Sequence, residues 1–242
     1  MSADANKKPL VLLPGFLCDQ TVWNFQIAEL SDIAECVVVD WGQLGSIEAM
    51  AEHVLRVAPQ RFALAGHSMG GRVAFQVYRK APDRVERIAL LNTGADARPG
   101  GEAGAEEERG RRELLAIALT QGMRAMALKW LTGMIPPYRM TDTALVEEIV
   151  RMFAGKSPEL FEIQMEALLA RPDARAVLSQ IRCPALVLTG ADDGWSTPAR
   201  HRDMAAAIAG ARLELIPRSG HMSTMERPSD VAEALRAWLE SS

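Results

Sequence analysis

The sequence predicts an α/β protein with a mostly parallel, doubly wound sheet of about six strands and one inserted helical segment. Short apolar runs recur along the chain, and most are continuous, as in strands that are covered on both faces. Helical patterns separate these runs, such as the apolar positions between Ile47 and Leu55 that repeat at i, i+3, i+4, i+7 and i+8. Strands that alternate with helices indicate a parallel sheet. The predicted strands span residues 10–13, 36–39, 62–65, 88–91, 185–188 and 213–216.

The alternation of strands and helices fails between Asn92 and Ala185, where only helical stretches such as 111–126 and 143–153 are found. We therefore expect residues 1–98 and 180–242 to form an α/β core. Residues 99–179 are predicted to form a helical lid over the carboxyl ends of the strands, where ligands bind in open α/β sheets. One charged cluster in this lid is interpreted as a solvated helix face and not as a substrate site. Its members are Glu106, Glu107, Glu108, Arg109, Arg111, Arg112 and Glu113.

The composition indicates a folded protein and argues against several kinds of partner. A hydrophobic content of 48% in 242 residues is ample for a buried core. The 27 basic and 31 acidic residues give a net charge of -4, which argues against nucleic acid or an anionic membrane as a partner. The three cysteines are far apart and form no Cys-x-x-Cys pair, which favours reduced thiols in the cytosol.

The apolar run at residues 9–17 follows Lys7 and Lys8 and so imitates a signal peptide. Pro14-Gly15 interrupts the run, however, and it is much shorter than the roughly 20 residues that span a bilayer. We interpret it as the first strand.

The segment Gly66-His67-Ser68-Met69-Gly70 directly follows a predicted strand and opens a helical pattern through Val73, Ala74 and Val77. Gly-x-Ser-x-Gly between a strand and a helix is typical of a nucleophile elbow, a strained turn that exposes the serine hydroxyl above the sheet. The flanking glycines avoid clashes in this turn. Ser68 is therefore the candidate nucleophile.

A serine hydroxyl needs a neighbouring base to take its proton. Of the four histidines, only His221 lies in a polar turn after a predicted strand, so it is expected over the same strand ends as Ser68. His53, His67 and His201 lie in helical patterns or inside the serine motif, and we expect packing or surface roles for them.

The base in turn needs a buried carboxylate to orient it. Asp192 and Asp193 both follow the strand that ends before Gly190, and the chain order Ser, Asp, His is that of one known class of triad. Spacing favours Asp193 as the acid, with Asp192 as a turn residue or helix cap; Asp192 remains the alternative.

An acyl-transfer intermediate also needs two preplaced N–H donors for its oxyanion. The backbone N–H of Met69 is one, and the second is expected from Phe16, with Leu17 in reserve. Side chains of the predicted lid and of these loops suggest a mostly apolar pocket. The candidate pocket residues are Leu17, Met123, Trp130, Trp195 and Met222.

Four segments together resemble the α/β-hydrolase superfamily, in particular its lidded esterases, enol-lactonases and carbon-carbon bond hydrolases. They are Leu-Pro-Gly-Phe at 13–16, Gly-His-Ser-Met-Gly-Gly at 66–71, Gly-Ala-Asp-Asp at 190–193, and Gly-His at 220–221 followed by Glu226-Arg227-Pro228. The resemblance implies a serine hydrolase with a Ser-His-Asp triad that acts on a small, mostly apolar ester or lactone. Carbon-carbon, amide or perhydrolytic cleavage on the same triad is the alternative, as is a non-catalytic small-molecule receptor.

The sequence departs from this family in two places. Most relatives carry His-Gly where this chain has Pro14-Gly15, so the hydrogen bonds by which that histidine braces the oxyanion loop must be replaced or absent. Only eight residues precede the apolar run that begins at Pro9, so we expect six strands without the antiparallel hairpin that starts many sheets of the family. No metal-ligand spacing or glycine-rich phosphate loop is found, so we expect no cofactor and a small-molecule acyl substrate as the partner.

Overall fold

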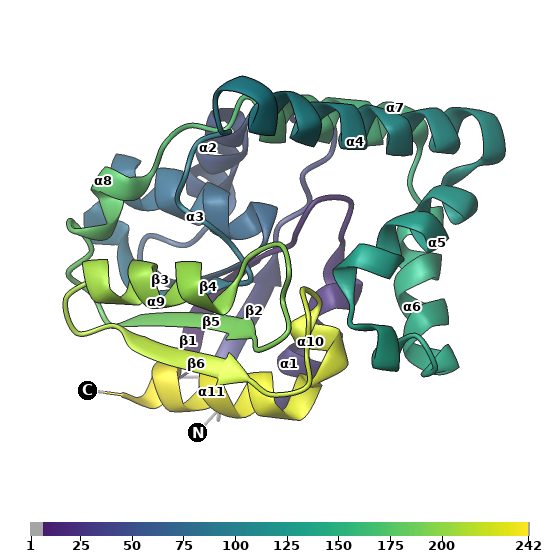
Figure 1. The fold of residues 1–242 in the computed structure, drawn as a ribbon. Helices are drawn as coiled ribbons and strands as arrows, with labels where there is room; N and C mark the ends of the chain where they lie inside the picture. Colours follow the sequence, from purple (N-terminus) through teal and green to yellow (C-terminus); the bar gives the residue numbers. More distant parts are fainter. Residues whose placement is uncertain (1–6, 242) are drawn as a thin grey trace.

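The computed structural model describes residues 7–241; residues 1–6 and 242 of the predicted core lie outside the described residues. A sheet of six parallel strands forms the centre of the molecule, in the order β2-β1-β3-β4-β5-β6 (Figure 1). Each neighbouring pair is parallel, which confirms the predicted sheet. The strands are β1 (Lys8–Leu13), β2 (Ala34–Val38), β3 (Phe62–His67), β4 (Val85–Leu91), β5 (Ala185–Gly190) and β6 (Arg212–Ile216).

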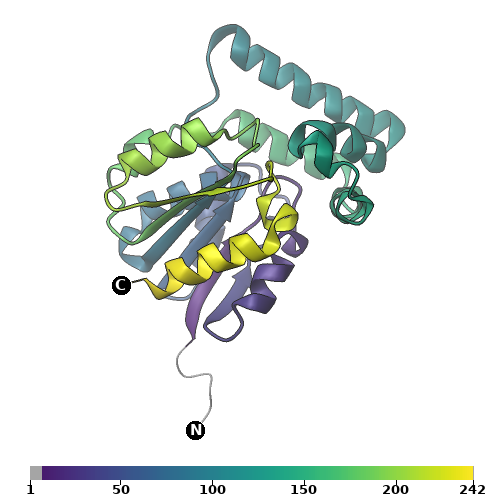
Figure 2. The same ribbon diagram turned by 60° about the horizontal axis from the view of Figure 1, so that its bottom comes forward.

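Helices cover both faces of this sheet (Figures 1 and 2). α1 (Asn24–Glu29) and α11 (Pro228–Glu240) lie on one face, and α2 (Ile47–Val57), α3 (Met69–Lys80) and α9 (Pro198–Ala207) lie on the other. All residues of β3 and β5 are buried as a result. This double cover explains why the strands read as continuous apolar runs in the sequence.

The chain between β4 and β5 forms five α-helices, the short 3-10 helix η4 (Pro137–Arg139) and, within the described residues, no strand. α4 and α7 pack along each other and α5 packs against α6, whereas the short α8 lies against α3 of the core (Figure 1). We call residues 99–179 the insertion; its division from the core as a separate lid stays a prediction. The helices are α4 (Gly101–Gln121), α5 (Met123–Met134), α6 (Thr143–Ala154), α7 (Pro158–Leu169) and α8 (Arg175–Leu178).

Polar side chains set where several helices begin. Ser46, Asp142 and Ser157 each accept a hydrogen bond from the backbone N–H three residues later, at 3.0, 3.2 and 3.2 Å. These bonds satisfy N–H groups that have no partner within the helix. The remaining short elements are η2 (Gln20–Trp23), η3 (Pro82–Arg84) and α10 (Ser223–Glu226). No helix in residues 7–241 combines the length and the apolar character needed to cross a membrane.

Candidate active site

Ser68 occupies a tight turn between β3 and α3, with φ 54° and ψ -113°. This positive φ is strained for a residue with a side chain. The two flanking glycines are required by space, because a Cβ at Gly66 would lie 2.5 Å from the carbonyl oxygen of Gly70, and a Cβ at Gly70 would lie 2.1 Å from that of Leu13. The local geometry is therefore that of the predicted strand-turn-helix motif, with the hydroxyl of Ser68 at a cavity.

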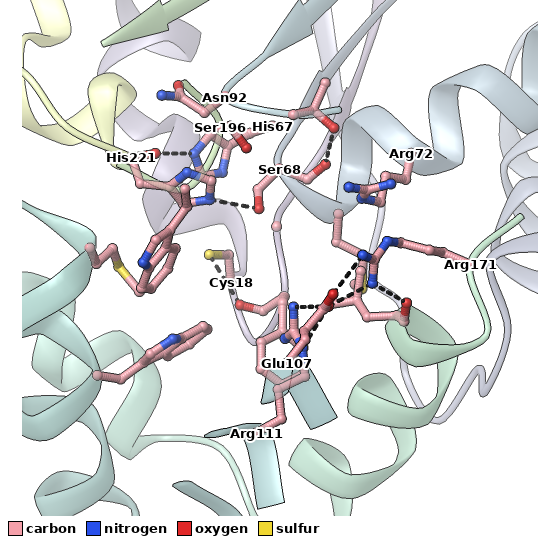
Figure 3. Close-up of a pocket in the computed structure, with 18 of the residues that line it drawn as sticks. Cys18, His67, Ser68, Arg72, Asn92, Glu107, Arg111, Arg171, Ser196 and His221 are labelled. Carbon is pink, nitrogen blue, oxygen red and sulfur yellow. Dashed lines mark hydrogen bonds and ion pairs between the residues drawn. The ribbon is translucent and has the colours of Figure 1, made fainter. Parts of the chain in front are cut away.

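His221 joins Ser68 to Asp193. Its Nε2 lies 2.9 Å from Ser68 Oγ, and its Nδ1 lies 2.9 Å from Asp193 Oδ2 (Figure 3 shows the contact with Ser68). Asp193 is 2% exposed and His221 is 7% exposed. A carboxylate can only accept, so Nδ1 carries the proton and Nε2 of the neutral ring is left to accept from the serine hydroxyl. The structure thus brings together the three residues that the sequence singled out.

The carboxylate of Asp193 receives donors on both oxygens. Oδ1 accepts the N–H groups of Trp195 and Ser196 at 2.9 Å each, while Oδ2 also accepts from Asn92 Nδ2 at 3.0 Å. Burial raises the pKa of Asp193, but the charge of His221 and these hydrogen bonds outweigh burial and hold the pKa well below its ordinary value. Asp193 is therefore ionised at neutral pH.

Asp192 lies differently from its neighbour. Its side chain is exposed and accepts a hydrogen bond from the hydroxyl of Tyr138 in η4. The structure therefore places Asp193, and not Asp192, beside His221.

Asn92 is a site residue that sequence reasoning missed. It directly follows β4 with φ 47°, and its Nδ2 donates both to Asp193 and to the carbonyl of Gly220, the latter at 3.1 Å. Asn92 Oδ1 accepts from the hydroxyl of Ser223. The side-chain amide of Asn92 thus connects the loop that carries Asp193 to the loop that carries His221. The sequence does carry a signal for Asn92, because a polar residue there directly follows a buried strand.

Glu226 supports the loop that carries His221. Its carboxylate accepts the N–H of Gly220 at 2.9 Å and that of Met222 at 3.0 Å, on either side of the histidine. The backbone N–H of His221 itself donates to the carbonyl of Met134 in α5 at 2.9 Å. Burial raises the pKa of Glu226 to about 7, although both N–H donors oppose this shift.

The other buried histidines hold backbone groups. His67 Nε2 donates to the carbonyl of His221 at 2.8 Å, and burial, followed by the charge of His221, lowers the pKa of His67 to about 4. His201 lies between the carbonyl of Thr197 and the N–H of Thr93, at 3.1 and 3.2 Å. Both rings are therefore neutral at neutral pH.

The loop after β1 lies next to Ser68. Leu17 has φ 57°, and its N–H donates to Gln164 Oε1 of α7 at 2.8 Å. In the described chain, no group accepts a hydrogen bond from the N–H of Phe16 or of Met69. Trp41 Nε1 donates to the carbonyl of Pro14 at 3.1 Å. Trp41 and Gln164 therefore hold this loop where most relatives are expected to use a histidine.

A cavity of about 650 Å³ opens at Ser68. One wall is aromatic, because Trp130 stacks on Trp195 with ring centroids 5.7 Å apart and also contacts Phe16 at 5.2 Å. Met222 lines the cavity too, as does Trp195, whose ring lies 5.1 Å from that of His221. Leu17 and Met123, in contrast, are not among the lining residues, because their side chains are buried in the apolar core.

Another part of the cavity wall is charged. Glu106, Glu107 and Arg111 of α4 line it. Glu106 is exposed as expected, whereas Glu107 and Arg111 are half-buried, so the expectation of a solvated charged face was wrong for these two residues. The remaining members of that cluster do not line this cavity; Arg109, Arg112 and Glu113 are exposed and Glu108 is half-buried. Arg72, Arg171 and Arg200 contribute further positive charge, and none of them was singled out from the sequence.

Comparison with known proteins agrees with this architecture. A family model described as "Alpha/beta hydrolase family" matches residues 10–234. The chain is 30% identical to the (E)-2-((N-methylformamido)methylene)succinate hydrolase of Acinetobacter baylyi, over 97% of this chain and 91% of that protein.

Two solved structures are similar over nearly the whole chain. An esterase from Thermogutta terrifontis in a malate-bound form has a TM-score of 0.83 at 29% identity, covering 97% of this chain and 90% of that one. The enol-lactonase of Burkholderia xenovorans also has a TM-score of 0.83, at 28% identity, with 98% and 93% covered.

Proposed function

We propose that this chain, which belongs to the alpha/beta hydrolase family, is a serine hydrolase that cleaves a small carboxylic ester or lactone. One observation carries the proposal: two contacts of 2.9 Å connect Ser68 Oγ, His221 and the ionised Asp193 at the edge of the cavity. An esterase and an enol-lactonase with similar structures support the proposal that an ester or lactone bond is cleaved.

In the proposed mechanism, Ser68 Oγ attacks the carbonyl carbon of the substrate while His221 Nε2 takes the hydroxyl proton. The N–H groups of Phe16 and Met69 donate to the oxyanion of the tetrahedral intermediate. The C–O bond of the ester then breaks, and His221 returns the proton to the leaving alkoxide. Asp193 stabilises the imidazolium in both steps. A water molecule repeats the cycle, which releases the acid and restores Ser68.

The surroundings of the site fit this reaction. The wall of Trp130 and Trp195 offers apolar contact for part of the substrate, and Trp195 shields His221 on one side. The thiols of Cys18, Cys36 and Cys183 are free, which supports a reducing compartment, and we place the enzyme in the cytosol.

A fluorophosphonate probe and p-nitrophenyl butyrate test the proposal together. Wild type should be labelled and should turn over, whereas Ser68→Ala should lose labelling and at least about 10⁴-fold in kcat. His221→Gln should lose turnover to a similar degree. Ser179→Ala is the matched control, because this serine lies on the surface with its hydroxyl near the carbonyl of Ala176.

Labelling or turnover that persists in Ser68→Ala would show that another residue is the nucleophile. A wild type that neither reacts with the probe nor hydrolyses any ester would instead favour a binding protein.

A further inference from the structure

Three arginines and one glutamate form the charged part of the cavity wall near Ser68 (Figure 3). Arg72 comes from α3, Glu107 and Arg111 come from α4, and Arg171 follows α7. We call the three cations the arginine group. Glu107 is the only carboxylate among these four side chains. Two further charged side chains of the wall, those of Glu106 and Arg200, cancel each other, so the wall carries an excess of positive charge.

Glu107 is already engaged by two members of the arginine group. Arg171 Nη1 and Nη2 donate to its two carboxylate oxygens at 2.6 and 2.7 Å. Arg111 Nε and Nη2 donate to Oε1 at 3.2 and 3.1 Å. These pairs tie α4 to the chain after α7, and they give Arg171 and Arg111 a structural role. Within residues 7–241, neither oxygen of Glu107 forms an ion pair with Arg72.

Arg72 has no such partner. Its Nη1 donates to the backbone carbonyl of Asp96 at 2.7 Å, and in residues 7–241 no carboxylate forms an ion pair with its guanidinium. Burial, followed by the charge of Arg171, lowers the pKa of Arg72 to about 9, so it is still charged at neutral pH. A partly buried charge without a counterion is costly, and an anion placed against it would be bound favourably.

The position of Arg72 relates this charge to the reaction. Arg72 lies four residues after Ser68, which is about 6 Å along the axis of α3. In Figure 3, Ser68 lies between His221 on one side and Arg72 with Arg171 on the other. An anion held by the arginine group would therefore be a few bonds from a carbonyl carbon held at Ser68 Oγ.

From this arrangement we propose that the substrate carries a carboxylate, which Arg72 binds while the neighbouring charge of Arg171 adds to the attraction. Guanidinium groups match a planar carboxylate through paired N–H donors. The proposed hydrolase would then act on the half-ester or lactone of a dicarboxylic acid, or on the ester of a hydroxy acid. This inference rests on the proposed function and replaces the expectation of a mostly apolar substrate: one end is charged, and the aromatic wall of Trp130 and Trp195 contacts the rest.

Matched pairs of substrates test the inference. Monomethyl glutarate and methyl valerate differ only in carboxylate against methyl, as do 4-acetoxybutyrate and butyl acetate, which place the charge in the leaving group. In at least one pair, wild type should favour the acid by roughly 10- to 100-fold in kcat/KM. Arg72→Gln should remove most of that preference, because it should lower kcat/KM for the acid far more than for the neutral ester.

Arg79→Gln is the control for Arg72→Gln. Arg79 lies on the same helix, is exposed, and also donates to a backbone carbonyl, that of Asp173 at 2.8 Å. The control should keep the full preference for the acid. Equal kcat/KM for acid and neutral ester in both pairs with wild type would overturn the inference, while Ser68-dependent turnover of the neutral esters would leave the hydrolase proposal standing.

Calorimetry separates binding from catalysis. Glutarate titrated into Ser68→Ala should bind at least about tenfold more tightly than glutaramide or inorganic phosphate. Binding of glutarate without any Ser68-dependent turnover in wild type would support the carboxylate site and reject the hydrolase. Equal binding of glutarate and glutaramide, or of glutarate and phosphate, would reject the carboxylate site.

Discussion

Gln164 Oε1 accepts a 2.8 Å hydrogen bond from the backbone N–H of Leu17, and this bond joins α7 of the insertion to the loop after β1. Gln164 is buried, and Leu17 is held in a left-handed conformation. With the N–H of Leu17 occupied, the N–H of the preceding Phe16 is the one left free to meet an oxyanion. Gln164 therefore positions the proposed oxyanion donor without contacting the substrate.

Replacement of this glutamine tests that role. Gln164→Met keeps the size but leaves the N–H of Leu17 without an acceptor, which costs about 1 to 3 kcal/mol. We expect kcat for a neutral ester to fall roughly tenfold with KM little changed. Gln76→Met is the control, because Gln76 is equally buried but lies in α3, and its Nε2 has no hydrogen-bond partner in the described residues. Steady-state kinetics with unchanged kcat in Gln164→Met would remove the assigned role.

The two neighbouring aspartates should differ sharply in their effect on activity. Asp193→Asn would place an amide beside His221 Nδ1 and favour the wrong tautomer, so kcat should fall by about 10³- to 10⁴-fold. Asp192→Asn alters only the surface contact with Tyr138 and should change kcat less than about twofold. Measurement of kcat for ester hydrolysis by both variants shows which of the two aspartates is the acid. The reverse pattern would assign the acid to Asp192.

Stability should depend on pH through Glu226. Its pKa is about 7 in the folded protein against an ordinary 4.5, because burial disfavours the carboxylate. The folded state therefore binds this proton more tightly than the unfolded state, and the free energy of unfolding falls as pH rises from about 4.5 to about 7. The full loss is on the order of 3 kcal/mol.

The variant Glu226→Gln removes that titration while it keeps an acceptor for the N–H groups of Gly220 and Met222. Urea unfolding at pH 5, 6, 7 and 8 should show a flatter profile than wild type. Glu233→Gln on the exposed face of α11 should retain the wild-type profile. Identical profiles for Glu226→Gln and wild type would exclude Glu226 as the titrating group.

The turn around Ser68 predicts a strong effect of one added methyl group. Gly70→Ala would place Cβ 2.1 Å from the carbonyl oxygen of Leu13, so either β1 or the turn must move. We expect a loss of at least about 3 kcal/mol and a Tm lower by roughly 6 °C or more.

In contrast, a Cβ at Gly110 meets open space within α4. Gly110→Ala should raise stability by about 0.5 to 1 kcal/mol, because alanine loses less backbone entropy in a helix. Thermal melts of the two variants should move in opposite directions. A Gly70→Ala protein as stable as wild type would contradict the tight approach of α3 to β1.

The sheet, the serine turn and the residues beside it were predictable because their signals are local. A buried parallel strand is a continuous apolar run, and residues that follow such strands meet at one edge of the sheet. Ser68, Asp193 and His221 each carry this signal. Asn92 carries it as well, and it was missed because an asparagine after a strand also suits an ordinary turn.

The charged wall of the cavity could not be read from the sequence in the same way. Glu107 and Arg111 belong to a cluster of acidic and basic residues, a pattern equally typical of a solvated helix. Which side of α4 faces Ser68 depends on how this helix rotates and packs against α7. Arg72 reads as an ordinary polar position of an amphipathic helix, and only the course of the insertion shows that its side of α3 borders a cavity.

Among the hydrogen bonds between the insertion and loops of the core, two hold loops of the site: Met134 accepts from the backbone N–H of His221, and Gln164 accepts from that of Leu17. Grafting the insertion of a relative onto this core would therefore transplant more than a specificity pocket. A chimera that lacks an acceptor at either place would inherit misaligned loops along with a new binding surface. Exchange of this segment among homologues is thus constrained by two backbone hydrogen bonds as well as by the side chains that line the cavity.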